Sequence, residues 1–510
     1  MDKQSTYWLT RVLLLRLLGF IYTVAFAVAF QQNAALIGER GLTPFRENLV
    51  FSSGSWSWAQ CLHGFFRRPT LLLFIGPTDA ALNILAATGL LLSAALMIFG
   101  AAPAWVLAVL WLLYSSIVNA GGVWYGFGWE SQLLETGFLA IFASPLLSCS
   151  RFPSRAPMSF VVIWGYRWLL LRLMLGAGLI KVRGDPCWRD LTCMNFHYET
   201  QPVPGPLSRQ FHLAPGWWHA VETLGNHFVE LAAPWLLLGP RDLRIAGGVI
   251  QVAFQLILIM SGNLSFLNWL TILPALACFD DLSLQWIFGR RAREAASKAE
   301  AEWRSSPHSL RSRSRIATEA LLAGLLLHLS RPVVLNLVSP RQAMNTSFDP
   351  FRIVNTYGAF GSITRVRTEI VLEGTFDDPA AGNATWQEFN FKCKPGDVRR
   401  RPCLITPYHY RLDWLMWFAA MSSYEQHPWI LKLAARLMQG DEAAYALLAH
   451  GPFSPANPPA AIRALHYTYK FSARGSDEAS RGQWYVRRRR RRDYFPPVTL
   501  EHPVIAQNFL

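Results

Sequence analysis

The side chains of this chain that could carry chemistry are polar or ionisable groups within or beside long apolar stretches. They are Glu130, Glu135, Arg167, Arg172, Lys181, Asn226, His227 and Glu230. Such groups are costly in a bilayer, so they mark functional candidates. The adjacent Asn226 and His227 are compatible with an enzyme of acyl transfer. Lys181, which follows a glycine-rich stretch, is compatible with a catalytic base in an enzyme that modifies lumenal proteins. The alternative, which we favour, is that the bases pair with Glu side chains or extend to the bilayer surface.

The elements that must position these groups are apolar runs of helical length. The chain of 510 residues is 52% hydrophobic and 16% charged. Nine candidate spans lie at 12–30, 80–99, 104–118, 133–147, 160–179, 223–238, 245–260, 264–278 and 320–338. Several are shorter than the ~20 residues that cross a bilayer. We therefore expect a polytopic α-helical membrane protein with an odd number of spans, from five to nine, in a membrane domain at 1–339.

Basic residues predict the orientation of these spans, because Lys and Arg gather in short cytoplasmic loops. Lys3, Arg11 and Arg16 place the N-terminus in the cytoplasm, and the most basic segment is the loop 281–318. The loop 182–222 and everything after the last span then lie in the lumen. The first apolar run is longer than the core of a typical cleaved signal peptide, so we interpret it as an uncleaved anchor.

Cysteines and glycosylation sequons agree with this map. Cys187 and Cys193 lie close together in one lumenal segment, and Cys393 and Cys403 in the other. The oxidising side of the membrane favours a local disulfide in each place, although four cysteines allow three connectivities and free thiols remain the alternative. The sequons at Asn345 and Asn383 fall in the lumenal tail. A third sequon, at Asn263 between two apolar runs, is interpreted as a tight turn.

The tail at 340–510 predicts a mixed, mostly β domain. Alternation of apolar and polar residues predicts strands at 366–374, 386–393, 466–472 and 483–486. Helical spacing predicts helices at 429–438 and 442–448. The arginine run 487–492 is interpreted as a solvated basic face.

Long strings of residues, spread over most of the chain, resemble those of the lipase maturation factor family. They are WYGFGWESQLLETGF at 124–138, MLGAGLIK at 174–181, DLTCM at 190–194, HYETQP at 197–202, SGNLSFLNWL at 261–270, IVNTYGAFG at 353–361 and YHYRLDWLMWF at 408–418. The resemblance implies a multi-pass protein of the endoplasmic reticulum membrane. Its implied role is to bring newly made lipoprotein lipase, hepatic lipase and endothelial lipase to an active, assembled and secreted state. The family is described with five spans, and its arginine run at this place is shorter.

A folding factor of this kind needs no cofactor, and we expect none. Its expected partners are immature secreted lipases, other lumenal folding factors and membrane lipid, with no nucleic acid. The alternatives are a membrane-embedded enzyme and a transporter, but the sequence contains no metal cluster, nucleophile elbow or phosphate loop and no clear internal repeat.

A candidate surface for contact with clients lies in the aromatic and charged segment 408–418. Its residues are of the types found at binding hot spots: Tyr408, Tyr410, Arg411, Trp414 and Trp417. The rival interpretation makes the segment part of the tail's own core, with Arg411 and Asp413 as a local ion pair.

Overall fold

The computed structural model describes the chain except for residues 1–4, 50–56, 306–312, 491 and 510. The basic positions Lys3, Arg311 and Arg491 therefore lie outside the described residues. Within these, five helices are long and apolar enough to cross a membrane: α1 (Trp8–Ile37), α5 (Asp79–Phe99), α8 (Phe160–Arg183), α13 (Arg241–Ser261) and α17 (Arg313–Val338). This odd number is the lower end of the predicted range, which is confirmed.

The other four predicted spans are short or broken in the structure. α6 (Ala104–Ala120) has 17 residues and α7 (Gly128–Ile141) has 14. α14 (Leu267–Ala275) continues only as a short 3-10 turn, Leu276–Cys278. The predicted span at 223–238 combines the end of α12 (Gly216–His227), a π turn (Phe228–Ala232) and a 3-10 helix (Ala233–Leu238). Pro234 lacks a backbone N–H, which accounts for the break at this point.

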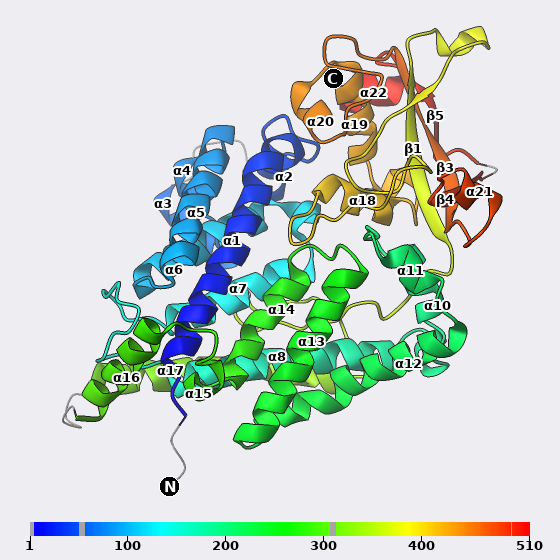
Figure 1. Ribbon diagram of the computed structural model, residues 1–510. Coiled ribbons are helices and arrows are strands. Elements are labelled where there is room, and N and C mark those ends of the chain that lie inside the picture. Colours follow the sequence, from blue (N-terminus) through cyan, green and yellow to red (C-terminus); the bar gives the residue numbers. More distant parts are fainter. Residues whose placement is uncertain (1–4, 50–56, 306–312, 491, 510) are drawn as a thin grey trace.

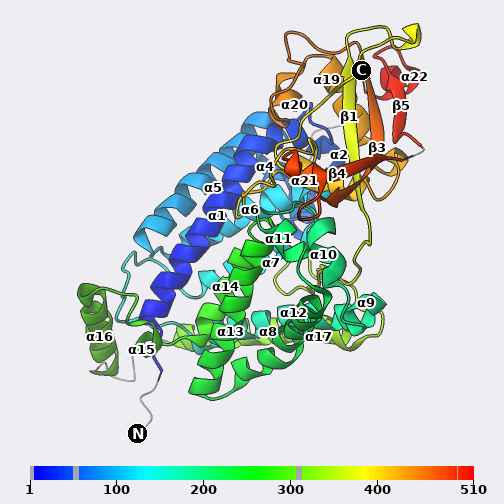
Figure 2. The same cartoon turned by 45° about the vertical axis from the view of Figure 1, so that its right-hand side comes forward.

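α1 is the central helix of the membrane half, and it lies beside α5 in both views (Figures 1 and 2). The two backbones approach closely at Gly19, where an added Cβ would lie 2.4 Å from the backbone N of Met97. Small residues permit such close packing of apolar helices in membranes. Stacked and edge-to-face rings of Tyr22, Phe26 and Tyr114 fill the space between α1 and α6.

Short helices connect the long ones. They are α2 (Phe45–Leu49), α3 (Trp58–Arg67), α4 (Leu72–Ile75), α9 (Pro186–Arg189), α10 (Met194–Thr200), α11 (Ser208–His212), α15 (Asp281–Leu284) and a 3-10 helix (Gly122–Tyr125). α16 (Arg290–Ser305) is longer and highly charged. It packs beside the start of α1, with Ala296 and Ala299 buried against Trp8 and Leu9.

The tail is built on one antiparallel sheet. Its strands are β1 (Arg367–Thr375), β2 (Gln387–Glu388), β3 (Ala461–Phe471), β4 (Tyr485–Arg489) and β5 (Phe495–Val498), in the order β2-β1-β3-β4, with β5 also paired to β3. Its helices are α18 (Arg411–Ala419), α19 (Trp429–Met438), α20 (Glu442–Ala446), α21 (Asp477–Ser480) and α22 (Pro503–Asn508). The predicted mixed domain is confirmed, although β2 is much shorter than expected and α18 and β5 were not predicted.

The tail lies at one end of the membrane helices, and α18 faces them (Figure 1). α18 lies against β1, while α19 packs on β3 and α22. The segment between β2 and α18 has no regular structure and runs down to the membrane helices. Contacts between the halves involve this irregular chain, α18 and the strand β1 through Arg367. In addition, α20 contacts α1, and Trp429 of α19 packs edge-on against Trp124.

Candidate functional site: the junction between membrane helices and tail

A buried ion pair joins α7 of the membrane half to α18 of the tail. Arg411 Nη1 donates to Glu130 Oε1 at 2.8 Å and to Trp124 O at 2.5 Å, and its guanidinium lies 3.5 Å from the ring centre of Tyr125. Both charged side chains are 0% exposed. Glu130 also accepts from the hydroxyl of Tyr114. The local pair of Arg411 with Asp413, which was part of the rival interpretation, does not form, since the partner of Arg411 comes from a distant helix.

The C-terminal end of α1 supports the same place in the tail. Gln32 Nε2 donates to Tyr408 Oη at 2.9 Å and to His409 O at 2.9 Å, while Gln32 Oε1 accepts from Arg411 N at 2.9 Å. Asn33 accepts from Tyr125 Oη at 2.7 Å. Gln32 therefore binds the backbone on both sides of Tyr410, where α18 begins, whereas Asn33 fixes the ring of Tyr125 beside Arg411.

A second buried pair binds the segment after α17. Arg172 pairs with Glu135, and Arg172 Nη1 donates to Asn355 O at 2.7 Å. Glu135 Oε2 accepts from Asn355 Nδ2 at 3.0 Å and from Tyr357 Oη at 2.7 Å. At Gly176 an added Cβ would lie 2.4 Å from Tyr357 O, so only a glycine lets α8 approach this backbone. The favoured interpretation of the intramembrane charges as ion pairs is confirmed here.

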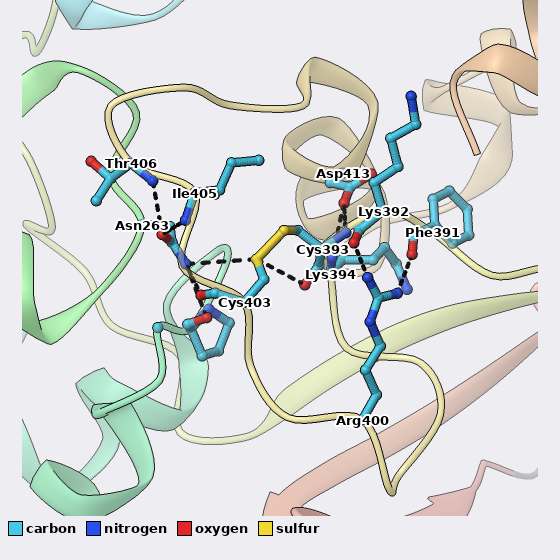
Figure 3. The surroundings of a disulfide bond; sticks show 12 residues. Asn263, Phe391, Lys392, Cys393, Lys394, Arg400, Cys403, Ile405, Thr406 and Asp413 are labelled. Carbon is cyan, nitrogen blue, oxygen red and sulfur yellow. Dashed lines mark hydrogen bonds between the residues drawn. A yellow bond between two sulfur atoms is a disulfide. The ribbon is translucent and has the colours of Figure 1, made fainter. Parts of the chain in front are cut away.

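Asn263, in the turn between α13 and α14, binds the chain around the second disulfide (Figure 3). Its Oδ1 accepts from the backbone N of Ile405 and Thr406 at 2.9 and 3.1 Å, and its Nδ2 donates to Cys403 O at 2.8 Å. Its side chain is buried, and a buried amide with these partners acts as a clamp on the irregular segment. Cys403 is bonded to Cys393.

Asp413 and His409 complete this region. Asp413 Oδ2 accepts from the backbone N of Cys393 at 2.5 Å and of Lys394 at 2.8 Å (Figure 3). Burial raises the pKa of Asp413 to about 6, although these N–H donors act in the opposite direction. Burial, and then the charge of Arg411, lowers the pKa of His409 well below its usual range. His409 is thus neutral, with Nδ1 2.8 Å from Ser265 Oγ.

The loop 182–222 forms the other side of the junction. It contains the Cys187–Cys193 disulfide, which is buried. From the tail, Arg367 donates to Glu199 O at 3.0 Å and Pro202 O at 2.9 Å. Trp417 Nε1 donates to Thr200 O at 2.9 Å. The loop and the tail therefore form one packed body.

A third buried pair lies where this loop meets α8. Lys181 Nζ lies 2.5 Å from Glu230 Oε1 and 3.2 Å from Asn226 Oδ1, and 5.0 Å from the ring centre of Trp188. His227 Nε2 lies 2.9 Å from Trp188 O. Arg167, in contrast, has no carboxylate partner among the described residues and donates to Ala277 O and Tyr7 Oη.

Two regions of the chain match family models. Residues 9–286 match the lipase maturation factor transmembrane domain, and residues 353–496 match the lipase maturation factor C-terminal domain. The chain is 53% identical to lipase maturation factor 1 of Mus musculus, over 98% of this chain and 88% of that protein.

The chain belongs to the lipase maturation factor family. It is also 52% identical to lipase maturation factor 1 of Homo sapiens, over 98% of this chain and 89% of that protein. Lipase maturation factor 2 of Xenopus laevis is 30% identical, over 96% of this chain and 82% of that protein. No solved structure matches the chain.

The strings that resemble the lipase maturation factor family meet at this junction. Glu130 and Glu135 come from the first string, Asn263 from a string between two apolar helices, and Asn355 and Arg411 from the tail. The resemblance singled out these strings, but nothing in their spacing indicated that Glu130 pairs with Arg411. The contributions of Gln32 and Arg367 have no signal in the sequence.

The structure places the predicted client-contact residues of this family member unevenly. Arg411 and Trp414 are buried in the junction, so in this conformation they serve packing and not an exposed surface. Tyr408, Tyr410 and Trp417 are half-buried. The predicted glycosylation acceptors Asn345 and Asn383 are both exposed.

Proposed function

We propose that this chain brings secreted lipases to an active, assembled form in the endoplasmic reticulum, and that its clients are lipoprotein lipase, hepatic lipase and endothelial lipase. Support comes from its similarity, over almost the whole chain, to proteins named lipase maturation factor 1. Immature secreted proteins expose apolar surface that aggregates, and a membrane-fixed domain that binds this surface keeps it in a folding-competent state.

The observation that carries this proposal is the junction itself. A tail bound to the membrane helices by the buried Glu130–Arg411 ion pair and by buried hydrogen bonds is a fixed platform, so a client bound to it is held at the membrane surface. The client-facing side chains of the segment 408–418 are then Tyr408, Tyr410 and Trp417, together with Phe418, which is 38% exposed. Aromatic side chains of this kind provide large contact area at low entropic cost.

We further propose that the N-terminus lies in the cytoplasm and the tail in the lumen. The exposed sequons at Asn345 and Asn383 lie on the lumenal side of this arrangement. So do both disulfides, which need an oxidising compartment. Cys149, in the irregular segment after α7, and Cys278, at the end of the 3-10 turn after α14, are unpaired, and so is Cys61 between α1 and α5.

A role without catalysis is proposed, but the cluster around Lys181 favours a second candidate, the modification of a lumenal protein. Glu230, the partner of Lys181, lies within a π turn, a feature that is frequent at functional sites. A double Lys181→Gln, Glu230→Gln variant separates the two, because it removes the charges as a pair. Full lipase maturation by a folded double variant identifies a structural pair, whereas loss of maturation with normal folding identifies an active lysine.

The test of the main proposal is a chain that ends after Ser339, expressed in cells that lack the factor. It should insert, since the five long apolar helices precede this point, yet leave lipoprotein lipase inactive and retained. Full-length Arg290→Met, altered on the exposed α16, serves as the matched positive control. If the shortened chain restores secreted lipase activity, the tail is dispensable and the loop 182–222 becomes the leading candidate.

A further inference from the structure

A cavity of about 340 Å³ lies at the end of the bundle opposite the tail. Three long apolar helices begin around it, α1 at Trp8, α8 at Phe160 and α17 at Arg313, and α16 forms its remaining wall. The level at which spanning helices begin is the level of the lipid headgroups. Tyr7, Trp8 and Trp303 line the cavity, and Tyr and Trp are enriched at this level of a membrane.

The cavity contains two carboxylates beside these aromatic rings. Glu300 accepts from Trp8 Nε1 at 2.9 Å and from Arg304 Nε at 2.5 Å. Glu319 accepts from Arg315 Nε at 3.0 Å, and its side chain remains 33% exposed. Carboxylates next to aromatic faces are the combination that binds alkylammonium cations, because the charge and the ring quadrupoles act together.

The cavity also contains one cation, Arg315. Its Nη2 donates to Pro157 O at 3.0 Å, and its guanidinium lies 5.5 Å from the ring centre of Trp303. A guanidinium has five N–H donors and matches the geometry of a phosphate. The lining thus offers sites for both charges of a phosphate ester that carries an ammonium group.

We propose that this cavity binds the headgroup of a zwitterionic phospholipid, with the ammonium group at Glu300 and Glu319 and the phosphate at Arg315. A lipid with an anionic headgroup that lacks an amine would bind Arg315 but bring no further cation to Glu300 and Glu319, which pair with Arg304 and Arg315 in the structure. The bound lipid would tie together the starts of α1, α8 and α17. This site is separate from the junction and from any contact with lipases.

The test is native mass spectrometry of the full-length chain, purified in a maltoside detergent and titrated with phosphatidylcholine or phosphatidylglycerol. We expect phosphatidylcholine to bind about 10-fold more tightly than phosphatidylglycerol, from charge-assisted contacts with the carboxylates. Glu300→Gln, Glu319→Gln should reduce phosphatidylcholine binding by about 10-fold and leave phosphatidylglycerol binding unchanged. Arg315→Gln should weaken the binding of both lipids.

The matched control is Glu294→Gln, which removes an exposed carboxylate of α16 that does not line the cavity. It should bind phosphatidylcholine like the wild type. Glu319→Gln alone is a second variant that keeps the hydrogen bond from Trp8 to Glu300. It should bind phosphatidylcholine about 3-fold more weakly than the wild type.

Soluble phosphocholine identifies the source of the headgroup. Competition with phosphatidylcholine would show that the headgroup alone suffices, and binding of the lipid without competition would show that the acyl chains are also required. Equal binding of the two lipids to the wild type, or wild-type phosphatidylcholine binding by the carboxylate variants, would overturn the proposal.

Discussion

Arg411 and Glu130 illustrate how single residues hold this molecule together. Each is fully buried, so each would be a large cost if its partner were absent. The pair is surrounded by further polar groups, since Tyr114 donates to Glu130 and Gln32 binds the Arg411 backbone. The main effect of the pair is therefore to specify which face of α18 packs against α7. Its net contribution to the free energy of folding is the smaller effect.

The first prediction concerns this pair. Arg411→Met leaves Glu130 charged and buried, and should destabilise the junction by about 3 to 5 kcal/mol. The double change Glu130→Gln, Arg411→Met should recover a large part of this loss. Limited proteolysis of the segment 393–410, which leads directly into α18, measures the loss, with faster cleavage expected in the single variant.

The control for that prediction is Arg290→Met, which breaks an exposed pair with Glu294. It should change the stability by less than about 0.5 kcal/mol. Equal cleavage rates for Arg411→Met and the wild type would show that the pair does not hold the tail.

The second prediction concerns pH and His197. Burial, and then the charge of Lys181, lowers the pKa of His197 to about 4. The unfolded chain therefore takes up this proton first, so the stability that His197 contributes is complete above about pH 6.5 and is lost towards about pH 4. The loss should approach about 1.4 kcal/mol per pH unit.

Thermal unfolding between about pH 7 and about pH 5 checks this prediction. His197→Phe keeps an aromatic ring against Phe360 but cannot titrate, so its melting temperature should fall less on acidification. His450→Phe, at an exposed position of the tail, should retain the wild-type pH dependence. Parallel curves for His197→Phe and the wild type would be the contrary result.

At the scale of elements, the loop 182–222 and the segment 393–410 are the two connecting segments that contact the opposite half of the molecule at the junction. Each contains one disulfide and each makes backbone hydrogen bonds to the opposite half. Neither segment forms a long helix or strand. The disulfides and the buried hydrogen bonds to the opposite half therefore replace the backbone hydrogen bonds that a helix or sheet would supply.

The third prediction is that both disulfides stabilise these connecting segments. The bonded cysteines are 6 and 10 positions apart. Loops of this size correspond to a loss of roughly 2 to 3 kcal/mol when Cys193→Ser or Cys403→Ser opens the crosslink. Denaturant unfolding measures the loss. Cys149→Ser, at an exposed unpaired cysteine, should match the wild type, and rapid labelling of all four bonded positions by a thiol reagent would contradict the pairing.

The success of the sequence in predicting an element depended on whether the apolar residues of that element face lipid or pack against protein. The long helices α1, α5, α8, α13 and α17 gave clear hydropathy signals because length and composition suffice to recognise them. α7 was predicted as a span from the apolar run 133–147, but it has 14 residues, contains Glu130 and Glu135, and contacts protein on most sides. Hydropathy does not distinguish protein from lipid as the neighbour of an apolar residue. α18 was missed because its aromatic and charged residues resembled a binding surface, whereas they fill the junction.

At the scale of the whole molecule, the two halves are one unit. The membrane helices supply Glu130, Glu135 and Asn263, and the tail supplies Arg411 and the backbone near Asn355. The candidate site could not be derived from the sequence because its contacts between the two halves join positions that are 140 to 281 residues apart. Only the chain's resemblance to the lipase maturation factor family indicated which strings to examine.

The fourth prediction tests the orientation of this unit. Both sequons of the tail are exposed, so glycosidase treatment of permeabilised microsomes should reduce the apparent mass of the wild type. The double Asn345→Gln, Asn383→Gln variant should not shift. Asn263→Gln should leave the glycosidase shift intact, because Asn263 is buried and bound to the tail. If glycosidase treatment does not change the apparent mass of the wild type, the sequons no longer support a lumenal position of the tail.

The distance along the chain between Glu130 and Arg411 has a consequence for biosynthesis. The two residues are 281 positions apart, and a ribosome that adds about 5 to 20 residues per second needs roughly 14 to 56 s to cover this interval. During this time α7 has been synthesised, but Glu130 has not yet met Arg411. In this interval a resident chaperone could bind the nascent chain at the exposed face of α7. Dissociation of that chaperone would then indicate that α18 has been synthesised.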